Sequence, residues 1–153
     1  MSIPKDVYTV SLYSTPMPFP LMLARHYWFV VTYQGSQDRY EVWAQTSTAA
    51  DGTVCKNVTD MYSGCRMMYG LHPLETRFMH RGTLLWTEDD AEGIASSLHA
   101  ILENSTKLYP YQHEYRLWPG PNSNTYIQWV LDQVPAVQWK LPWRAFGKSY
   151  AVG

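Results

Sequence analysis

The sequence has little charge, and the charge it has is dispersed. Charged residues make up 16% of the 153 residues, and 12 Lys and Arg against 13 Asp and Glu give a net charge of −1. The basic residues are scattered along the chain without forming a run. Proteins that bind nucleic acid usually carry a basic patch, because the phosphate backbone attracts it. The composition therefore argues against a nucleic-acid partner.

Long apolar runs and metal-ligand spacings are missing as well. No uninterrupted apolar segment approaches the ~18 residues of a membrane-spanning helix, and the N-terminus lacks the apolar core of a secretory signal. Cys55 and Cys65 lack the Cys-x-x-Cys or histidine spacing typical of zinc sites. We therefore expect a cytoplasmic protein with reduced thiols, no membrane span, no metal and no cofactor. A Cys55–Cys65 disulfide is the alternative if the chain is exported by another route.

Aromatic residues, by contrast, are abundant. They reach 15% of the chain and include 7 Trp and 12 Tyr, more than one small core normally takes up. Because Trp and Tyr combine a large apolar body with a polar tip, they suit binding grooves and interfaces. We expect some of them to line such a surface.

The pattern of elements predicts one α+β domain over residues 1–153, with an antiparallel sheet packed against helices. Strands are expected early and helices late, which excludes alternating βαβ units. Alternating or β-branched segments predict strands over 7–13, 25–33, 39–46, 66–69 and 78–86. Helical spacing predicts helices over 88–105 and from about 122 to before Pro135. Loops are expected over 15–20 and 49–64, and an extended surface segment over 141–148.

The turn Gly120–Thr125 is the most informative segment for function. It follows an extended aromatic run and brings Ser123 to the start of the second helix. A nucleophilic Ser or Cys gains most at such a place, because unpaired helix-start N–H groups can hold a developing oxyanion. An ordinary N-cap serine occupies the same position, so the pattern alone does not separate the two functions.

A serine nucleophile needs a base, and His26 lies at the head of the strongest predicted strand. Strand alternation puts His26 and Trp28 on one face. On the neighbouring strand one face carries Arg39, Glu41, Trp43 and Gln45. Glu41 or Gln45 could bind the second imidazole nitrogen and fix the tautomer. We prefer Gln45, although the hairpin register is open. A satisfied structural histidine is the alternative for His26.

Further residues are expected to contact the substrate. The side chain of Asn122 or Asn124 would assist the backbone N–H groups at the oxyanion, although both residues also suit a plain turn. Three tryptophans are expected to form contact surfaces for a small-molecule or peptide substrate: Trp28, Trp43 and Trp118.

The run Tyr115–Tyr126, with its Trp-Pro-Gly-Pro-Asn-Ser-Asn-Thr-Tyr core, resembles the signature of an uncharacterised domain-of-unknown-function family. The His26-Tyr27-Trp28 strand and the segment Leu141–Lys148 match that family's other motifs, so the resemblance covers the chain from about residue 25. Ser149 departs from it, because an acidic residue is expected at that position.

A more distant similarity links the motif to circularly permuted papain-like hydrolases and acyltransferases, including relatives of lecithin–retinol acyltransferase. There a histidine on an early strand precedes a nucleophilic cysteine at a helix start, in an Asn-Cys-x-x-Phe setting. Asn122-Ser123-Asn124-Thr125-Tyr126 resembles that setting with serine instead of cysteine. A serine hydroxyl is not ionised near neutral pH and depends on a real base.

The leading hypothesis is thus a papain-like hydrolase or acyltransferase acting on an amide or ester through Ser123 and His26. The competing hypothesis is a non-catalytic, aromatic-rich module that binds a sugar, a small molecule or a peptide. A third is a structural role in which residues 139–150 form an interface. The oligomeric state is left open.

Overall fold

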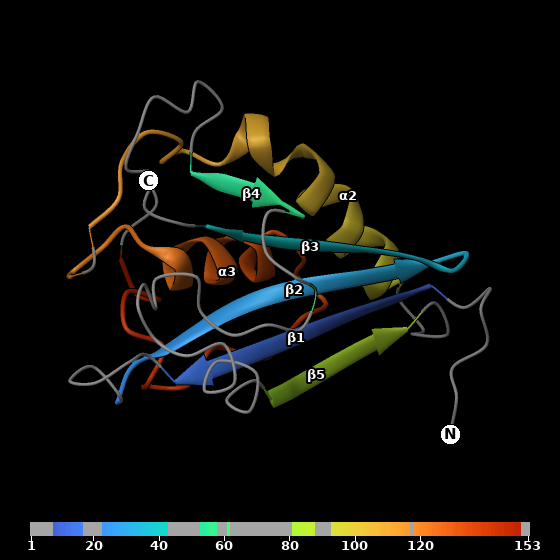
Figure 1. The fold of residues 1–153 in the computed structure, drawn as a ribbon, viewed down its shortest axis with the longest axis horizontal. Coiled ribbons are helices and arrows are strands. Elements are labelled where there is room, and N and C mark those ends of the chain that lie inside the picture. Colours follow the sequence, from blue (N-terminus) through green and yellow to red (C-terminus); the bar gives the residue numbers. More distant parts are fainter. Residues whose placement is uncertain are drawn as a thin grey trace.

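The computed structural model describes residues 8–16, 23–42, 53–57, 61, 81–87, 93–116 and 118–150, with the backbone alone for 81–87. These residues form an α+β fold with one five-stranded antiparallel sheet in the order β4-β3-β2-β1-β5. Two helices lie over one face of it (Figure 1). The strands are β1 (Thr9–Pro16), β2 (Arg25–Tyr33), β3 (Ser36–Val42), β4 (Val54–Lys56) and β5 (Arg81–Thr87). The helices are α2 (Ile94–Leu108) and α3 (Ser123–Asp132).

Strand β2 has the predicted bounds and lies at the centre of the sheet. The hairpin to β3 is tighter than expected, because Gln34 and Gly35 alone form the turn, with φ of 50° and 80°. A two-residue turn with positive φ at both positions matches the twist of the flanking strands, so β3 begins already at Ser36. The expected end of that strand, residues 43–46, lies outside the described residues.

Two predicted loops were wrong in part. β1 continues through Thr15 and Pro16, and both residues pair with β2. Proline is tolerated there because β5 pairs with β1 only up to Ser14, so no neighbouring strand needs a hydrogen bond from the missing proline N–H. Within the expected loop 49–64, Val54–Lys56 adds a short edge strand to β3. The strand expected over 66–69 lies outside the described residues, while β5 confirms a strand within 78–86.

Helix α2 begins later than its sequence predicts. Gly93 is the residue before the helix and has a left-handed backbone, with φ of 64°. Glycine adopts this conformation at little cost, so Gly93 marks the helix start instead of lying inside the helix. The residues 88–92 that were expected to open the helix lie outside the described residues. The helix extends to Leu108, three residues past the predicted 105.

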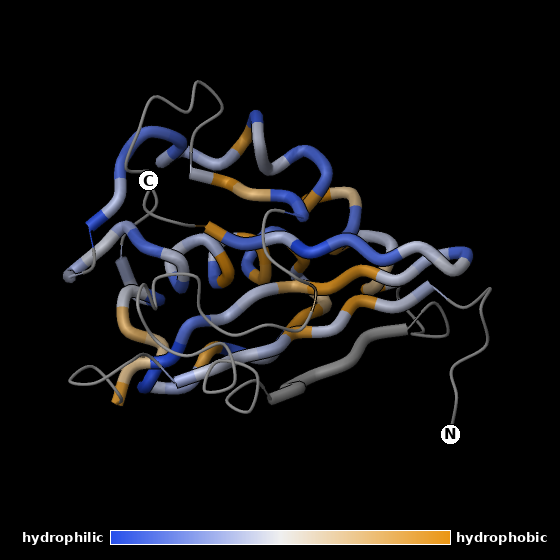
Figure 2. The backbone as a smooth tube through the Cα atoms, viewed as in Figure 1, coloured by the Kyte–Doolittle hydropathy of each residue, from blue (hydrophilic) through white to orange (hydrophobic). Residues whose placement is uncertain are grey.

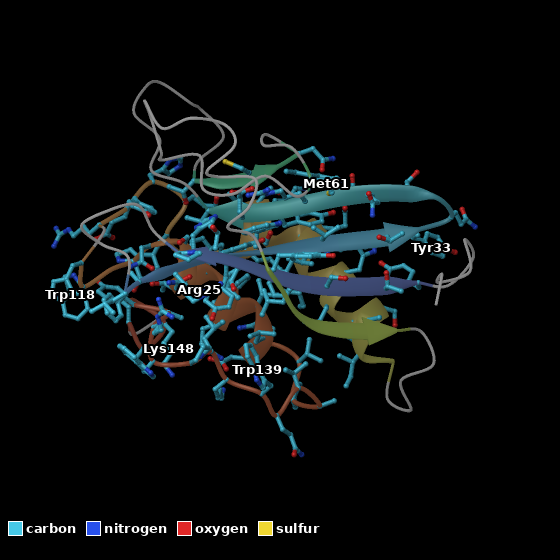
Figure 3. The ribbon with its side chains drawn as sticks, turned by 60° about the horizontal axis from the view of Figure 1, so that its bottom comes forward. Arg25, Tyr33, Met61, Trp118, Trp139 and Lys148 are labelled. Carbon is cyan, nitrogen blue, oxygen red and sulfur yellow. The ribbon has the colours of Figure 1, made fainter. Side chains whose placement is uncertain are left out.

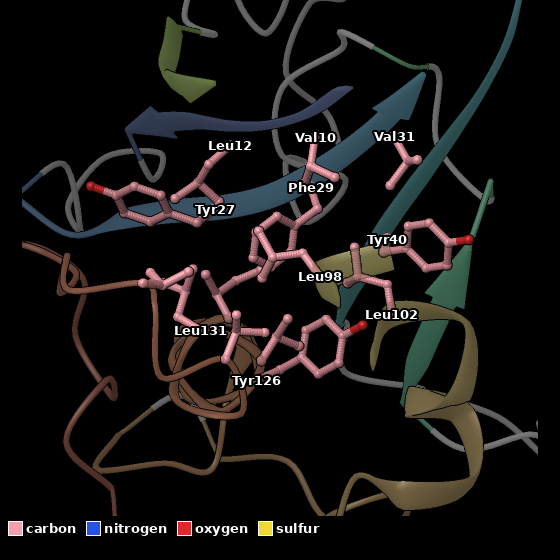
Figure 4. Close-up of a cluster of buried hydrophobic side chains, with 14 of the residues drawn as sticks. Val10, Leu12, Tyr27, Phe29, Val31, Tyr40, Leu98, Leu102, Tyr126 and Leu131 are labelled. Carbon is pink, nitrogen blue, oxygen red and sulfur yellow. The ribbon is translucent and has the colours of Figure 1, made fainter. Parts of the chain in front are cut away.

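The main core lies between the sheet and the helices. Side chains from one face of the strands pack against α2 and α3, as Figure 4 shows for Tyr27, Phe29, Leu98 and Tyr126. In Figure 2 hydrophobic residues gather where the strands pass over the helices, and the β2–β3 hairpin tip is hydrophilic. Ser105 Oγ and Tyr126 Oη, 2.8 Å apart, share a hydrogen bond that joins the two helices within this core.

The segment 141–148 is not the expected extended surface strip. Leu141 and Ala145 are buried in the core, and the backbone from Trp143 to Ser149 is a succession of turns. Gln128 on α3 accepts a hydrogen bond from the Leu141 N–H at 2.9 Å. The tail is therefore part of the fold and packs against α3.

Candidate functional site

Asn122, and not Ser123, caps α3. Its Oδ1 accepts hydrogen bonds from the N–H groups of Asn124 at 3.0 Å and Thr125 at 3.4 Å. In return, the Asn122 N–H donates to Thr125 Oγ1 at 3.0 Å, which completes a capping box. Ser123 becomes the first residue of the helix, as the turn pattern predicts, but it is free of the capping task.

Ser123 is 6% exposed, and its hydroxyl makes no hydrogen bond to any residue that the structure describes. Its own N–H is likewise uncommitted within that part of the chain. The N–H groups of Asn124 and Thr125 are occupied by Asn122. Of the helix-start donors expected to hold an oxyanion, the Ser123 N–H is therefore the one left for that task.

Asn124 fastens the start of α3 to two other segments. Its Nδ2 donates to the carbonyl of Arg25, the first residue of β2, at 2.7 Å and to the carbonyl of Phe146 at 3.1 Å. With both donors engaged, this side chain has none left for the expected oxyanion role. Its Oδ1 is buried and has no hydrogen-bond partner among the described residues.

Gly147 packs directly on Asn122. A Cβ at this position would lie 2.2 Å from Asn122 Nδ2, and the residue has a φ of 95°. Thr125 Oγ1 also donates to the Gly147 carbonyl at 2.7 Å. The absence of a side chain thus lets the tail close over the capping box.

His26 lies in a buried polar cluster on the sheet face opposite the main core. Its Nε2 is 3.2 Å from Glu41 Oε1, and both side chains are 1% exposed. Arg39 donates to both oxygens of Glu41, through Nη2 at 3.0 Å and through Nε. The Arg39 guanidinium also lies over the Trp28 ring, 4.2 Å from its centroid. This cluster is defined here as the His26 cluster: His26, Trp28, Arg39 and Glu41.

The His26 cluster holds its histidine neutral. Burial lowers the pKa of His26, and this outweighs the opposing hydrogen bond and charge of Glu41. For Glu41, burial alone would raise the pKa, but the hydrogen bond from His26 and the charge of Arg39 turn the net shift downward. A carboxylate only accepts, so His26 Nε2 carries the proton and Nδ1 carries the lone pair.

The structure brings Ser123 to the end of β2 where His26 lies, through the Asn124–Arg25 hydrogen bond. It does not join the two side chains by a hydrogen bond. His26 points away from the face that carries its neighbour Tyr27 and α3, so the two groups can meet only around the end of the strand.

The remaining residues predicted for the site differ in their burial and in their contacts. Glu41 contacts His26 as one of the two expected partners, whereas Gln45 lies outside the described residues, as does Trp43. Trp28 is fully buried and donates through Nε1 to the Met61 carbonyl at 3.2 Å, so it is no surface platform. Trp118 is 72% exposed.

Two contacts were not predicted from the sequence. Strand alternation puts Arg39 and Glu41 on one face, but it does not reveal the pair of hydrogen bonds by which Arg39 holds Glu41 in the His26 cluster. Phe146 lies between the exposed rings of Trp118 and Trp143, with centroids 6.0 and 6.4 Å away. The sequence identified the Leu141–Lys148 motif that contains Phe146, but not the contacts of Phe146 with the two tryptophans.

The described residues contain no helix able to cross a membrane. Nor do three or more His, Cys, Asp or Glu side chains come together within that part of the chain as a metal site would require. Cys55 is buried, and its thiol lies 3.5 Å from the Thr53 carbonyl, while Cys65 lies outside the described residues.

A family model covers residues 7–150, which include both the His26 cluster and the capped start of α3. The chain belongs to the DUF3750 family. Its description is a protein of unknown function, so membership in DUF3750 identifies relatives without assigning an activity. No curated protein and no solved structure matches the chain significantly. The chemistry of this DUF3750 protein therefore has to be inferred from the arrangement of its own residues.

Proposed function

We propose that this DUF3750 protein is a serine-dependent hydrolase or acyltransferase acting on an amide or an ester. The observation that supports it best is the state of Ser123. This residue opens α3 with a hydroxyl and an N–H that make no hydrogen bond to any described residue, because Asn122 has taken over the capping. A serine at the N-cap would use its oxygen for that hydrogen bond, whereas Ser123 follows the cap and its oxygen has no such role.

The proposed reaction follows from the groups near the end of β2. The Ser123 hydroxyl adds to the acyl carbonyl while His26 Nδ1 takes its proton. The Ser123 N–H then donates to the oxyanion. His26 returns the proton to the leaving amine or alcohol, and an acyl-serine remains. Water or an acceptor alcohol or amine then releases the acyl group by the reverse steps.

Glu41 serves as the orienting group of this proposal. Its hydrogen bond to Nε2 fixes the tautomer in which Nδ1 is the basic nitrogen, and its charge stabilises the imidazolium formed during attack. Arg39 keeps the carboxylate ionised and in place. The order of a histidine on an early strand before a helix-start nucleophile is that of permuted papain-like enzymes, which is the architecture we propose.

The missing hydrogen bond between Ser123 and His26 is compatible with this function. Catalytic hydrogen bonds are often long in the free protein and shorten when substrate binds. The proposal therefore requires a movement at the end of β2 that brings His26 Nδ1 toward the helix start.

A fluorophosphonate probe tests the proposal, because it reacts far faster with an activated serine than with an ordinary one. Intact-mass and peptide analysis should find a single adduct on Ser123, which disappears in Ser123→Ala. The matched control is Ser149→Ala, an exposed serine in the tail, which should label like the wild type. An adduct on other serines only, or none at all, would contradict the proposal.

A non-catalytic binding module is the second candidate. It is favoured by the exposure of Trp118 and Trp143 together with the lack of a Ser123–His26 hydrogen bond. Such rings suit a sugar, an aromatic metabolite or a peptide. This function would leave Ser123 unlabelled, while a bound ligand would quench tryptophan fluorescence, and that quenching would weaken in Trp118→Ala.

A further inference from the structure

One end of the molecule exposes large apolar side chains. Of the described residues, five large hydrophobics are exposed, and three of them gather here: Trp118 at 72%, Trp143 at 67% and Leu23 at 64%. Phe146 packs between the two indoles. We call this surface the tryptophan end, and define it by Leu23, Trp118, Trp143 and Phe146.

Backbone and side-chain hydrogen bonds hold the two segments of the tryptophan end together. Arg144 Nε donates to the Leu23 carbonyl at 2.8 Å, and the Arg25 N–H donates to the Arg144 carbonyl at 2.9 Å. The tail and the segment before β2 are thereby joined beside the start of α3. Figure 3 shows Trp118, Arg25 and Lys148 toward one end of the molecule and Tyr33 at the other.

The same end is basic. Its described segments, 23–27, 114–116, 118–125 and 141–150, carry four cationic residues, Arg25, Arg116, Arg144 and Lys148, against one acidic residue, Glu114. The whole chain has a net charge of −1, so this end of the molecule is more positive than the chain as a whole. Exposed indoles therefore share one end of the molecule with basic side chains, of which Arg116 is exposed and Arg25, Arg144 and Lys148 are half-buried.

We propose that the tryptophan end docks onto an anionic lipid bilayer. Indole rings favour the boundary between headgroups and acyl chains, where their apolar body is buried and their N–H remains hydrated. Arg and Lys side chains beside them are attracted by the negative surface potential of anionic lipids. Their alkyl stems cover apolar surface while the charged heads stay in water.

Other occupants fit the surface less well. Nucleic acid would use the cations but leave Leu23 exposed to a polar backbone. A symmetric dimer through this face would set the same four cations against each other, and like charges across an interface are unfavourable. An anionic lipid surface satisfies both the rings and the charges.

Vesicle sedimentation of the full chain tests this proposal. The protein should pellet with vesicles of phosphatidylcholine and phosphatidylglycerol, and much less with phosphatidylcholine alone. Added salt should weaken binding, because it screens the attraction. Trp118→Ala and Trp143→Ala should each lower the partition coefficient about tenfold. Lys148→Gln should lower it about fivefold.

The matched controls lie outside the tryptophan end. Tyr33→Ala removes an exposed ring at the far end of β2, and Lys107→Gln removes an exposed cation at the end of α2. Both should bind vesicles like the wild type, and so should Ser123→Ala, because docking does not depend on the proposed chemistry. Folding of each variant is checked by circular dichroism.

Three results would overturn the proposal. One is equal binding to neutral and anionic vesicles, and another is binding that Trp118→Ala and Trp143→Ala leave unchanged. The third is a protein that fails to sediment with vesicles but forms a dimer, seen by size exclusion, that Trp143→Ala dissolves. A failure of docking with Ser123 still labelled by the fluorophosphonate would reject the membrane surface and keep the proposed enzyme.

Discussion

Asn122 and Ser123 divide two tasks that are often combined in one residue at a helix start. Asn122 satisfies two backbone N–H groups, while the hydroxyl and N–H of Ser123 bond no residue in the described part of the chain. A capping serine would have its oxygen aimed back at the helix. Asn122, which precedes Ser123, thus relieves the serine hydroxyl of the capping hydrogen bond.

His26 should make the stability of the protein depend on pH. Because its pKa is lowered by burial in the folded state, the unfolded chain binds the proton more readily, and stability falls as pH drops through the unfolded value of about 6.5. Between pH 7.5 and 5.5 we expect this group to remove up to about 1.4 kcal/mol from the free energy of unfolding.

Urea unfolding at both pH values measures this effect. His26→Gln keeps a donor for Glu41 but does not titrate, so its loss of stability over the interval should be smaller than that of the wild type. Glu41 acts at lower pH, since its pKa is lowered and its contribution is lost only as pH falls through that value. An equal loss in both proteins would contradict the neutral, buried state of His26.

At the scale of elements, the start of α3 depends on the tail that covers it. Gly147→Ala would force a side chain into Asn122 and a left-handed φ onto a non-glycine residue. We expect a loss of more than about 3 kcal/mol of stability, because strain and overpacking add. Urea unfolding midpoints provide the measurement.

Gly35→Ala is the matched control for Gly147→Ala. Gly35 also has a positive φ, of 80°, but a Cβ there would meet nothing within 4 Å. It should therefore lose only about 1 kcal/mol, from backbone strain alone. Similar losses in the two variants would show that the tail does not press on the capping box.

At the scale of the whole molecule, the tail belongs to the folded body. Leu141 and Ala145 are in the core, and the Phe146 and Gly147 carbonyls accept hydrogen bonds from α3. Removing residues 141–153 should therefore abolish cooperative thermal unfolding, measured by circular dichroism. A truncated protein that melts cooperatively near the wild-type temperature, with only its assembly altered, would contradict this.

Sequence patterns predicted the elements whose formation depends on residues close together in the chain. The β-branched, aromatic run of β2 and the turn into α3 appear where the sequence indicates, since both depend on neighbouring residues. The late start of α2 was missed because a single glycine, Gly93, has a left-handed backbone there and so precedes the helix instead of lying within it. The short strand β4 was missed because its formation depends on β3 as a partner.

In the candidate site, too, the features set by neighbouring residues were predicted and those set by distant contacts were not. Alternation along β2 and β3 correctly groups His26 with Trp28 and Arg39 with Glu41. Choosing Glu41 as the partner of His26 required the hairpin register, which the two-residue turn sets and the sequence leaves open. The burial of the tail depends on contacts between distant segments, which no local pattern encodes.

The rate at which a fluorophosphonate modifies Ser123, followed against pH, tests the partnership of Ser123 and His26 most directly. The wild-type rate should rise through a single ionisation below pH 6.5, because the lowered pKa of His26 leaves its imidazole neutral there. His26→Gln should lose that ionisation and react at least about 100-fold more slowly. A Ser123 that reacts at the wild-type rate in His26→Gln, with the same pH profile, would contradict the proposed chemistry.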